Sequence, residues 1–244
     1  MWTYPRVLAH RGGGVLAPEN TMAALRKGFA MGFRGVEFDV MATRDDELVL
    51  MHDDVSGRTV AGNCSIGQLN LSDLLAMDAG QWFSAEYAGE LVPSFAQATE
   101  YCVSSGIFMN AEIKPVPGQE VRTAELVAQF CNLLPQGSVL VSSFSLDALR
   151  VTKQLAPAVP RAWLVESVPD DWSQTLAMLD STTLHAQAKT LNASVIAALK
   201  AEDINLLAYT VNDPAQARAL FTMGVDAICT DRLDLIGPDF FDNL

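Results

Sequence analysis

The sequence predicts one α/β domain folded as a (β/α)8 barrel (TIM barrel) with a small insertion after the second strand. Short apolar segments alternate with longer amphipathic segments along most of the 244 residues, which is the pattern of strands and helices around a parallel sheet. About eight such units fit, and one barrel of this type typically needs about 250 residues. Half of the residues are hydrophobic, so the chain can bury a large core. A doubly wound open sheet is the alternative that the same alternation allows.

The first fifty residues contain three predicted strands and one helix. The strands are short apolar segments at 7–9, 35–40 and 47–51. The helix spans 20–31, because Pro18 and Asn20 are typical of a helix start and Gly32 is typical of a helix end. Residues 44–46 (Arg-Asp-Asp) form a turn, since Asp tolerates the left-handed conformation. We count 47–51 as part of the excursion that follows the second strand.

Residues 53–92 interrupt the alternation. They are rich in Gly, Ser and Asp, and contain one short helical piece near 71–77 and the aromatic pair Trp82 and Phe83. The segment is longer than an ordinary loop between two elements. We interpret it as an insertion at one end of a single domain that spans residues 1–244, and the aromatic pair as a subunit contact or a substrate lid.

Strands and helices alternate regularly again after the insertion. Strands are predicted at 107–113, 139–143, 161–165, 183–187, 206–211 and 225–229. Helices are predicted at 94–104, 120–134, 146–154, 171–179, 193–201 and 214–223. Every strand is therefore separated from the next by one helix, as a parallel barrel requires.

Charge and cysteine content exclude several functions. Lys plus Arg number 16 and Asp plus Glu 29, so the net charge of −13 argues against binding to nucleic acid or to an anionic membrane. The four cysteines form no C-x-x-C pair, which excludes zinc-ribbon and thioredoxin-type motifs. Neither a signal peptide nor a long apolar span is recognisable. We expect a protein of the reducing cytoplasm, without stable membrane insertion, as a monomer or a homodimer.

Three carboxylates interrupt two of the apolar strands. Glu37 and Asp39 alternate within 36–40, so both side chains point to the same face of their strand. Glu112 and Lys114 repeat this spacing on a different strand. Carboxylates are costly to bury unless they are paired or bind a metal, and three of them facing one interior suit a hard divalent cation such as Mg²⁺ or Ca²⁺. Ion pairs with nearby Lys or Arg are the structural alternative.

Two of the three histidines end short apolar strands. His10 and His52 therefore lie at the end of the barrel where active sites form. Two imidazoles beside a metal can act as general base and general acid. Arg11, next to His10, and Lys114 are candidates to clamp a phosphate, although both can also pair with the three carboxylates.

Two further residues are weaker candidates for the walls of a substrate pocket. His185 lies on a later strand, and a residue that only lines the barrel mouth is the better interpretation of it. Tyr209 lies near the end of another strand, and a core aromatic is an equally good interpretation of it.

A dinucleotide-binding turn is the main competing hypothesis. Gly12, Gly14 and Ala17 follow a strand and precede a helix, and Glu37 occupies the position of the acidic residue of that fingerprint. Such a turn would make the protein a nucleotide-dependent oxidoreductase. However, Pro18 stands where the helix should already run, and the fingerprint leaves both strand-end histidines without a role.

The motifs taken together resemble the glycerophosphodiester phosphodiesterase family, especially its bacterial cytosolic type. The resemblance extends along the chain over nine short motifs: His10-Arg11-Gly12, Pro18-Glu19-Asn20-Thr21, Glu37-Phe38-Asp39-Val40, His52-Asp53, Glu112-Ile113-Lys114-Pro115, Ser142-Ser143-Phe144, Tyr209-Thr210-Val211-Asn212, Gly224-Val225-Asp226 and Thr230-Asp231. Each motif alone is weak, but their combination in this order is highly specific.

The resemblance implies a fold, a reaction and a site. The fold is a (β/α)8 barrel with a family-specific insertion. The reaction is hydrolysis of glycerophosphodiesters, such as glycerophosphocholine and glycerophosphoethanolamine, to sn-glycerol 3-phosphate and an alcohol. One divalent cation, Mg²⁺ or Ca²⁺, would be bound by Glu37, Asp39 and Glu112. His10 and His52 would be catalytic, and Arg11 and Lys114 would bind the phosphate.

Several details depart from the family pattern. The family usually has Asp-Gly where this chain has Asp45-Asp46, which affects only a turn. Arg58-Thr59 is followed by an unusual sequence, so the shape of the insertion and the headgroup preference stay open. Many members have Trp where Tyr209 stands. A lysophospholipase D-type activity and a non-catalytic phosphodiester or metal sensor are the alternatives on the same fold.

Overall fold

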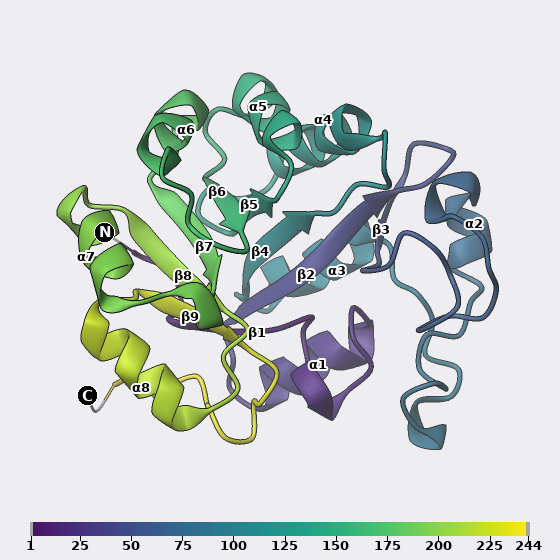
Figure 1. Ribbon diagram of the computed structural model, residues 1–244. Coiled ribbons are helices and arrows are strands. Elements are labelled where there is room, and N and C mark those ends of the chain that lie inside the picture. Colours follow the sequence, from purple (N-terminus) through teal and green to yellow (C-terminus); the bar gives the residue numbers. More distant parts are fainter. Residues whose placement is uncertain (1, 243–244) are drawn as a thin grey trace.

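Eight parallel strands form a closed barrel within residues 2–242, the part of the chain that the computed structural model describes (Figure 1). Strand β1 pairs with both β2 and β9, which closes the sheet and excludes the open doubly wound alternative. The barrel strands are β1 (Val7–Ala9), β2 (Gly35–Ala42), β4 (Phe108–Ile113), β5 (Val139–Ser143), β6 (Arg161–Val165), β7 (Thr183–Gln187), β8 (Asn205–Tyr209) and β9 (Ala227–Thr230).

Helices surround this barrel, as Figure 1 shows. They are α1 (Met22–Ala30), α3 (Phe95–Ser104), α4 (Glu120–Cys131), α5 (Leu146–Leu155), α6 (Trp172–Leu179), α7 (Ala193–Ala201) and α8 (Pro214–Met223). A further single-turn helix, α2 (Leu71–Leu74), lies to the side of the barrel beyond β3. Several begin at a side chain that accepts a hydrogen bond from the first turn, among them Thr21, Ser94 and Ser145. The buried faces of the helices pack against the outer face of the strands, which forms the main hydrophobic core.

The interior of the barrel is apolar at one end and polar at the other. An apolar cluster that includes Leu8, Leu140 and Leu207 fills the part toward the N-terminal ends of the strands. There Tyr4 stacks on Phe108, the first residue of β4. The polar residues lie further along the same strands, toward their C-terminal ends. The barrel interior is therefore a packed core, and its polar residues lie at the rim where active sites of this fold form.

The segment 47–51 lies outside the barrel, which confirms the prediction that it belongs to the excursion after the second strand. Strand β3 (Leu48–Leu50) runs antiparallel to β2, with Val40 opposite Leu50, and lies at the edge of the sheet. The turn between them contains Asp46 at a positive φ of 61°, as the Arg-Asp-Asp sequence predicts. Because β3 precedes it, the irregular segment 53–92 begins after this hairpin and not directly after β2.

The segment 53–92 buries a small hydrophobic cluster of its own. Ile66, Leu74 and Val92 pack there against Met41 and Val49 of the β2–β3 hairpin. The short helix predicted at 71–77 is only the single turn Leu71–Leu74. These contacts attach the segment to one side of the barrel, where Figure 1 shows it beside β3.

Most element boundaries agree with the prediction to within a few residues. The last strand begins at Ala227 and not at Val225, because the backbone N–H of Val225 bonds to Leu220 and belongs to the end of α8. Among the described residues, no helix is both long enough and apolar enough to cross a membrane.

Candidate active site

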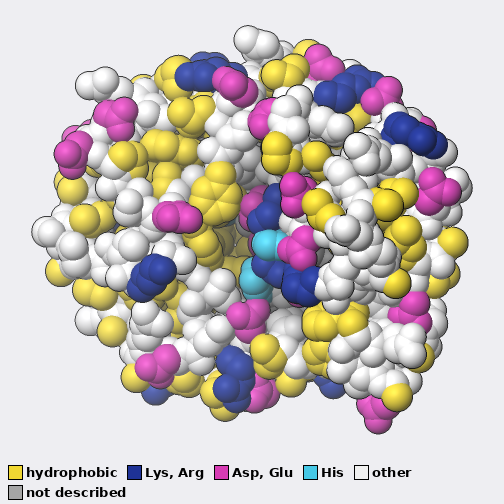
Figure 2. All heavy atoms as spheres, turned by 45° about the vertical axis from the view of Figure 1, so that its right-hand side comes forward, with side chains coloured by type: hydrophobic (Ala, Val, Ile, Leu, Met, Phe, Trp, Pro, Cys, Tyr) yellow, Lys and Arg dark blue, Asp and Glu magenta, His cyan; other side chains and the backbone are white. Residues whose placement is uncertain are grey.

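The predicted site residues meet at the C-terminal ends of the barrel strands. Figure 2 shows a hollow in which histidine, basic and acidic side chains gather. Glu37 and Asp39 come from β2 and Glu112 from β4, and the pairing of the two strands places Asp39 opposite Glu112. The alternation of side chains along a strand directs all three carboxylates into the barrel.

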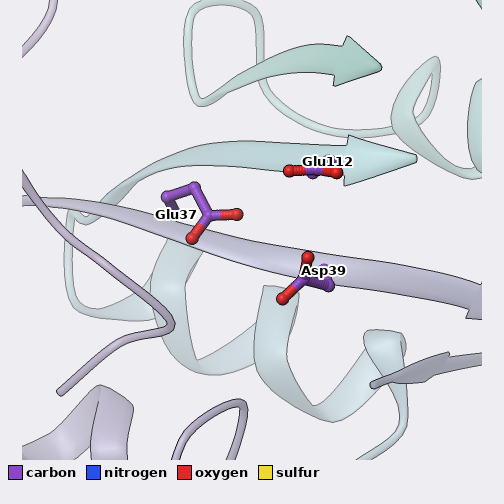
Figure 3. Close-up of side chains that lie close together, drawn as sticks. All are labelled: Glu37, Asp39 and Glu112. Carbon is purple, nitrogen blue, oxygen red and sulfur yellow. The ribbon is translucent and has the colours of Figure 1, made fainter. Parts of the chain in front are cut away.

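The three carboxylates form one buried acidic cluster (Figure 3). One oxygen from each of Glu37, Asp39 and Glu112 lies within 4.8 Å of the other two. Burial, followed by repulsion from Asp39, raises the pKa of Glu37 to about 7 and that of Glu112 to about 8. Burial also opposes ionisation of Asp39, but the charges of Arg11 and Lys114 bring its pKa below the usual value.

This donor set fits a hard divalent cation. All three groups offer oxygen ligands, and Glu112 Oε1 is buried without a hydrogen bond from any described residue. A cation bound there would favour the ionised forms of Glu37 and Glu112, whose charges otherwise repel one another. Among the described residues, this is the one group of three carboxylate, histidine or cysteine side chains with such a spacing.

His10 is held by a carboxylate from the other end of the chain. Its Nδ1 lies 2.5 Å from Oδ1 of Asp231, and Asp231 Oδ2 accepts a hydrogen bond of 2.8 Å from Asn212. Because a carboxylate only accepts, Nδ1 of His10 carries the proton. The other ring nitrogen, Nε2, then faces the acidic cluster, 3.7 Å from Glu37 Oε2.

His52 has the same arrangement with a different carboxylate. Its Nδ1 donates to Asp53 Oδ1 over 2.7 Å, and its Nε2 accepts from the Lys114 ammonium over 2.8 Å. Lys114 Nζ also lies 3.6 Å from Asp39 and 3.5 Å from Glu112. Lys114 therefore connects the second imidazole to the acidic cluster.

The environments of the two histidines shift their pKa values in opposite directions. Burial lowers the pKa of His10, but its hydrogen bond to Asp231 and the charges of Glu37 and Asp231 raise it above the ordinary value overall. Burial is the largest influence on His52, and together with Arg11 and Lys114 it lowers the pKa of that imidazole. Opposite shifts are typical of a site with one acid and one base.

Arg11 anchors the loop after β1 to the acidic cluster. Its backbone N–H donates to Glu37 over 3.1 Å, its Nη1 donates to Glu19 over 2.7 Å, and its Nε lies 3.5 Å from Asp39. Asn20 holds Asp39 from two sides, since its amide donates to the carboxylate and accepts from the Asp39 backbone N–H. Arg11 and Asn20 both have positive φ, which is uncommon outside glycine and is held here by these contacts.

Tyr209 and His185 lie on the opposite side of the barrel from β2. The Tyr209 hydroxyl donates to the Val165 carbonyl over 2.9 Å, and its ring meets the half-exposed ring of Phe144 edge to face. His185 is fully buried, and neither ring nitrogen has a hydrogen-bond partner among the described residues. It lines a cavity of about 30 Å³ together with Tyr209 and Glu37. The position at the barrel mouth is therefore wrong for His185, which lies inside the barrel because the apolar side chains of neighbouring strands, such as Leu164 and Leu207, pack around it.

Polar residues to which the sequence assigns no chemistry complete the site. They are Glu19, Asn20, Asp53, Arg58 and Asp231. Glu19, Asn20, Asp53 and Asp231 lie inside the nine motifs singled out in the sequence, and Asp53 directly follows His52. Their place in these motifs is the signal that could have identified them, whereas their partners become visible only in three dimensions.

The dinucleotide-binding hypothesis is wrong for this chain. Residues Gly14–Leu16 form a 3-10 turn, and α1 begins only at Met22. Glu37 points to His10 and the backbone of Arg11 inside a closed barrel. No helix N-terminus therefore follows the glycine turn in the place where a pyrophosphate would bind.

Comparison with known proteins gives a consistent relationship over nearly the whole chain. Residues 10–235 match the Glycerophosphoryl diester phosphodiesterase family. The chain is 30% identical over 230 residues to a glycerophosphodiester phosphodiesterase of Caldanaerobacter subterraneus, covering 92% of this chain and 93% of the relative. A similar protein from Bacillus altitudinis is 30% identical over 233 residues, covering 93% and 94% of the two chains.

Solved structures show the same fold. A phosphodiesterase of Oleispira antarctica, in complex with the product sn-glycerol-3-phosphate, aligns with a TM-score of 0.90 and 35% identity over 93% of both chains. A glycerophosphodiester phosphodiesterase of Agrobacterium tumefaciens aligns with a TM-score of 0.79 and 25% identity over 98% and 99%. The chain belongs to the glycerophosphoryl diester phosphodiesterase family, whose members are phosphoric diester hydrolases.

Proposed function

We propose that this enzyme hydrolyses small glycerophosphodiesters, such as glycerophosphocholine and glycerophosphoethanolamine, to sn-glycerol 3-phosphate and an alcohol. One observation carries the proposal: a carboxylate holds Nδ1 of each of two imidazoles, and the Nε2 atoms face the acidic cluster. Nε2 of His10 faces Glu37, and Nε2 of His52 accepts from Lys114 beside the cluster. The structurally similar Oleispira antarctica phosphodiesterase, which holds sn-glycerol-3-phosphate, supports the same product.

Glu37, Asp39 and Glu112 would bind one divalent cation, Mg²⁺ or Ca²⁺. When bound, such a cation polarises the phosphoryl oxygens and helps to orient the nucleophile. Asn20 fixes the orientation of Asp39 through two hydrogen bonds, as is usual for carboxylates that bind a metal.

Arg11 and Lys114 would bind the phosphate of the substrate. Both side chains border the acidic cluster, and both already contact Asp39. Their positive charges would stabilise the negative charge on the equatorial oxygens in the transition state. The guanidinium can bind two oxygens at once, whereas the ammonium acts as a point charge.

The two histidines would transfer the protons. Nε2 of one imidazole takes a proton from the nucleophile as the new P–O bond forms. Nε2 of the other gives a proton to the departing alcohol oxygen as the old P–O bond breaks. The nucleophile is water or the 2-hydroxyl of the glycerol, and in the second case a cyclic phosphate is then opened by water. Asp231 and Asp53 each accept from Nδ1, which leaves Nε2 as the atom that exchanges the proton: the base ring is the neutral Nδ1–H form, and the acid ring is the imidazolium, protonated on both nitrogens.

Tyr209 would form a wall of the substrate pocket, and the half-exposed Phe144 ring extends that wall. His185 would support this wall from below, since both it and Tyr209 line the same small cavity. This side of the site is apolar, which suits the carbon skeleton of a glycerol group.

A coupled assay tests the proposal. Purified protein is mixed with glycerophosphocholine or glycerophosphoethanolamine, and release of sn-glycerol 3-phosphate is followed with glycerol-3-phosphate dehydrogenase. We expect EDTA to abolish release and added Mg²⁺ or Ca²⁺ to restore it. Authentic sn-glycerol 3-phosphate added with EDTA controls for the coupling enzyme. Absence of release with every diester and either metal would refute the proposed function.

A further inference from the structure

One arginine of the segment 53–92 binds two carboxylates that support the catalytic candidates. We propose that Arg58 is a positioning residue, which orients His52 through Asp53 and orients Arg11 through Glu19. The proposal deepens the proposed function and rests on the roles given there to His52 and Arg11. It assigns to the irregular segment a direct part in building the active site.

The guanidinium of Arg58 makes four short hydrogen bonds. Its Nη1 and Nη2 donate to the two carboxylate oxygens of Glu19, each over 2.7 Å. Its Nε donates to Asp53 Oδ2 over 2.6 Å, and Nη2 also donates to Asp53 Oδ1 over 3.0 Å. Two bidentate contacts on one planar guanidinium define the position of both carboxylates.

The first chain of hydrogen bonds connects Arg58 through Asp53 to His52. Asp53 Oδ1, which accepts from Arg58, also accepts from Nδ1 of His52. Asp53 is partly exposed, so without the arginine its carboxylate can rotate into solvent. The hydrogen bonds from Arg58, ahead of that from His52, keep the pKa of Asp53 at about 2, so this carboxylate stays ionised and remains an acceptor.

The second chain of hydrogen bonds connects Arg58 through Glu19 to Arg11. Glu19 Oε1 accepts from Nη2 of Arg58 and from Nη1 of Arg11, both over 2.7 Å. The Glu19 side chain is largely buried, and two guanidinium groups neutralise its charge. Glu19 thereby fixes the orientation of the Arg11 guanidinium beside Asp39.

The backbone around Arg58 is itself held in place. The backbone N–H of Gly57 donates to Val60, and that of Ser56 donates to Cys64. The Ser56 hydroxyl in turn accepts from the Cys64 backbone N–H over 2.9 Å. A turn closed in this way presents the arginine from a defined position, so its contacts do not depend on a freely moving loop.

An ordinary surface ion pair on the same chain offers a matched comparison. Arg122 is as exposed as Arg58 and also contacts two carboxylates, Asp46 and Glu125. Neither of those carboxylates contacts a candidate catalytic residue. If Arg58 stabilised only the fold, its removal should resemble removal of Arg122.

The first test observes the imidazole and does not depend on turnover. The chain has three histidines, so ¹⁵N-histidine labelling yields a spectrum with few signals. In the Mg²⁺-loaded wild type, we expect His52 as the Nδ1–H tautomer. In Arg58→Ala, we expect its two ring nitrogens to shift toward averaged values, whereas Arg122→Ala should leave them unchanged. His52→Gln assigns the signals.

The second test uses kinetics to separate the contact of Arg58 with Asp53 from its contact with Glu19. We expect Arg58→Ala to lower kcat about 10- to 100-fold, the range typical of outer partners that orient imidazoles at metal sites. We also expect Arg58→Ala to raise KM, because Glu19 then no longer orients Arg11, which would bind the phosphate. The effect on kcat should vanish when Asp53→Asn is already present, and the effect on KM should vanish when Glu19→Gln is present. Arg58→Lys should recover only part of the loss, because an ammonium cannot make both bidentate contacts.

The outcomes separate this proposal from the proposed function. If the wild type released no sn-glycerol 3-phosphate, the proposed function would fail, and the His52 spectra would still decide whether Arg58 orients the ring. If Arg58→Ala kept both the Nδ1–H tautomer and a kcat within twofold of wild type, the positioning role would be overturned. Equal losses in Arg58→Ala and Arg122→Ala would also overturn it.

Discussion

His10 and Asp231 are 221 residues apart in the chain, yet His10 Nδ1 lies 2.5 Å from Asp231 Oδ1. The contact forms because β1 pairs with β9, and the backbone N–H of His10 donates to the Thr230 carbonyl over 3.0 Å. Closing the barrel therefore also brings together one imidazole and the carboxylate that sets its tautomer. This half of the site is therefore complete only in the closed barrel.

Asp231→Asn tests that relationship. The amide can present its NH₂ to Nδ1, which favours the wrong tautomer of His10, so we expect kcat to fall by about 10²- to 10⁴-fold, as in other imidazole–carboxylate pairs. The coupled assay measures the loss. Asp234→Asn is the control, because Asp234 pairs only with the neighbouring Arg232. A kcat within threefold of wild type would exclude a role for the carboxylate.

Removing either imidazole tests the acid–base pair. We expect His10→Ala and His52→Ala each to lower kcat by about 10²- to 10⁴-fold, since one proton transfer loses its side chain. Circular dichroism and thermal unfolding should remain close to wild type, because both rings are partly exposed at the rim. Near-normal turnover in either variant would remove that histidine from the mechanism.

Glu112→Gln tests the acidic cluster. The amide keeps the size of the side chain but removes one anionic ligand, so we expect weaker binding of Mg²⁺ or Ca²⁺ and a higher metal concentration for half-maximal activity. Isothermal titration calorimetry and metal titration of the activity measure both effects. An unchanged metal titration would show that Glu112 is not a ligand. Glu125→Gln, on the outer face of α4, is the control.

Gly14→Ala tests the packing of the loop after β1 against the segment after β9. A Cβ on Gly14 would lie 2.1 Å from the Asp231 carbonyl oxygen, at a φ of +54°. Gly106 has a similar φ of +64° but open space around it. We expect Gly106→Ala to cost about 1 kcal/mol of unfolding free energy from backbone strain. Gly14→Ala should cost about 1–3 kcal/mol more. Equal losses in urea unfolding would contradict the clash.

His185→Leu tests the buried histidine through the pH dependence of stability. Burial lowers the pKa of His185 from 6.5 to about 3, so between these values the unfolded chain binds a proton that the folded chain does not. The folded state therefore loses stability as pH falls through this window. From pH 6.5 to 4.5 we expect wild type to lose about 2–3 kcal/mol more than His185→Leu. Urea unfolding measures the difference. His10, Glu37 and Glu112 around the same cavity titrate in both proteins, so their contributions to the pH dependence cancel. Parallel pH profiles would show that His185 titrates normally.

The sequence by itself predicts the fold and much of the site. Periodicity determines where strands and helices form, and their regular alternation leads to a parallel barrel. Carboxylates at alternate positions of a strand must share a face, so the direction of Glu37 and Asp39 follows from local geometry. The position of His10 follows from the same logic, since the C-terminal ends of all barrel strands meet at one rim. The position of His52 does not, because β3 runs antiparallel to β2 outside the barrel and returns the chain to Asp39, whose carbonyl accepts from the Met51 backbone N–H.

The tertiary structure alone decides which partner each of these residues has. Strand register brings Asp39 opposite Glu112, and barrel closure brings Asp231 to His10. The turn at 56–64 brings Arg58 to Glu19 and Asp53. None of these contacts follows from local periodicity, because each depends on how distant segments pack. Packing is also what buries His185 and the carboxylates, and burial is the leading influence on their pKa values.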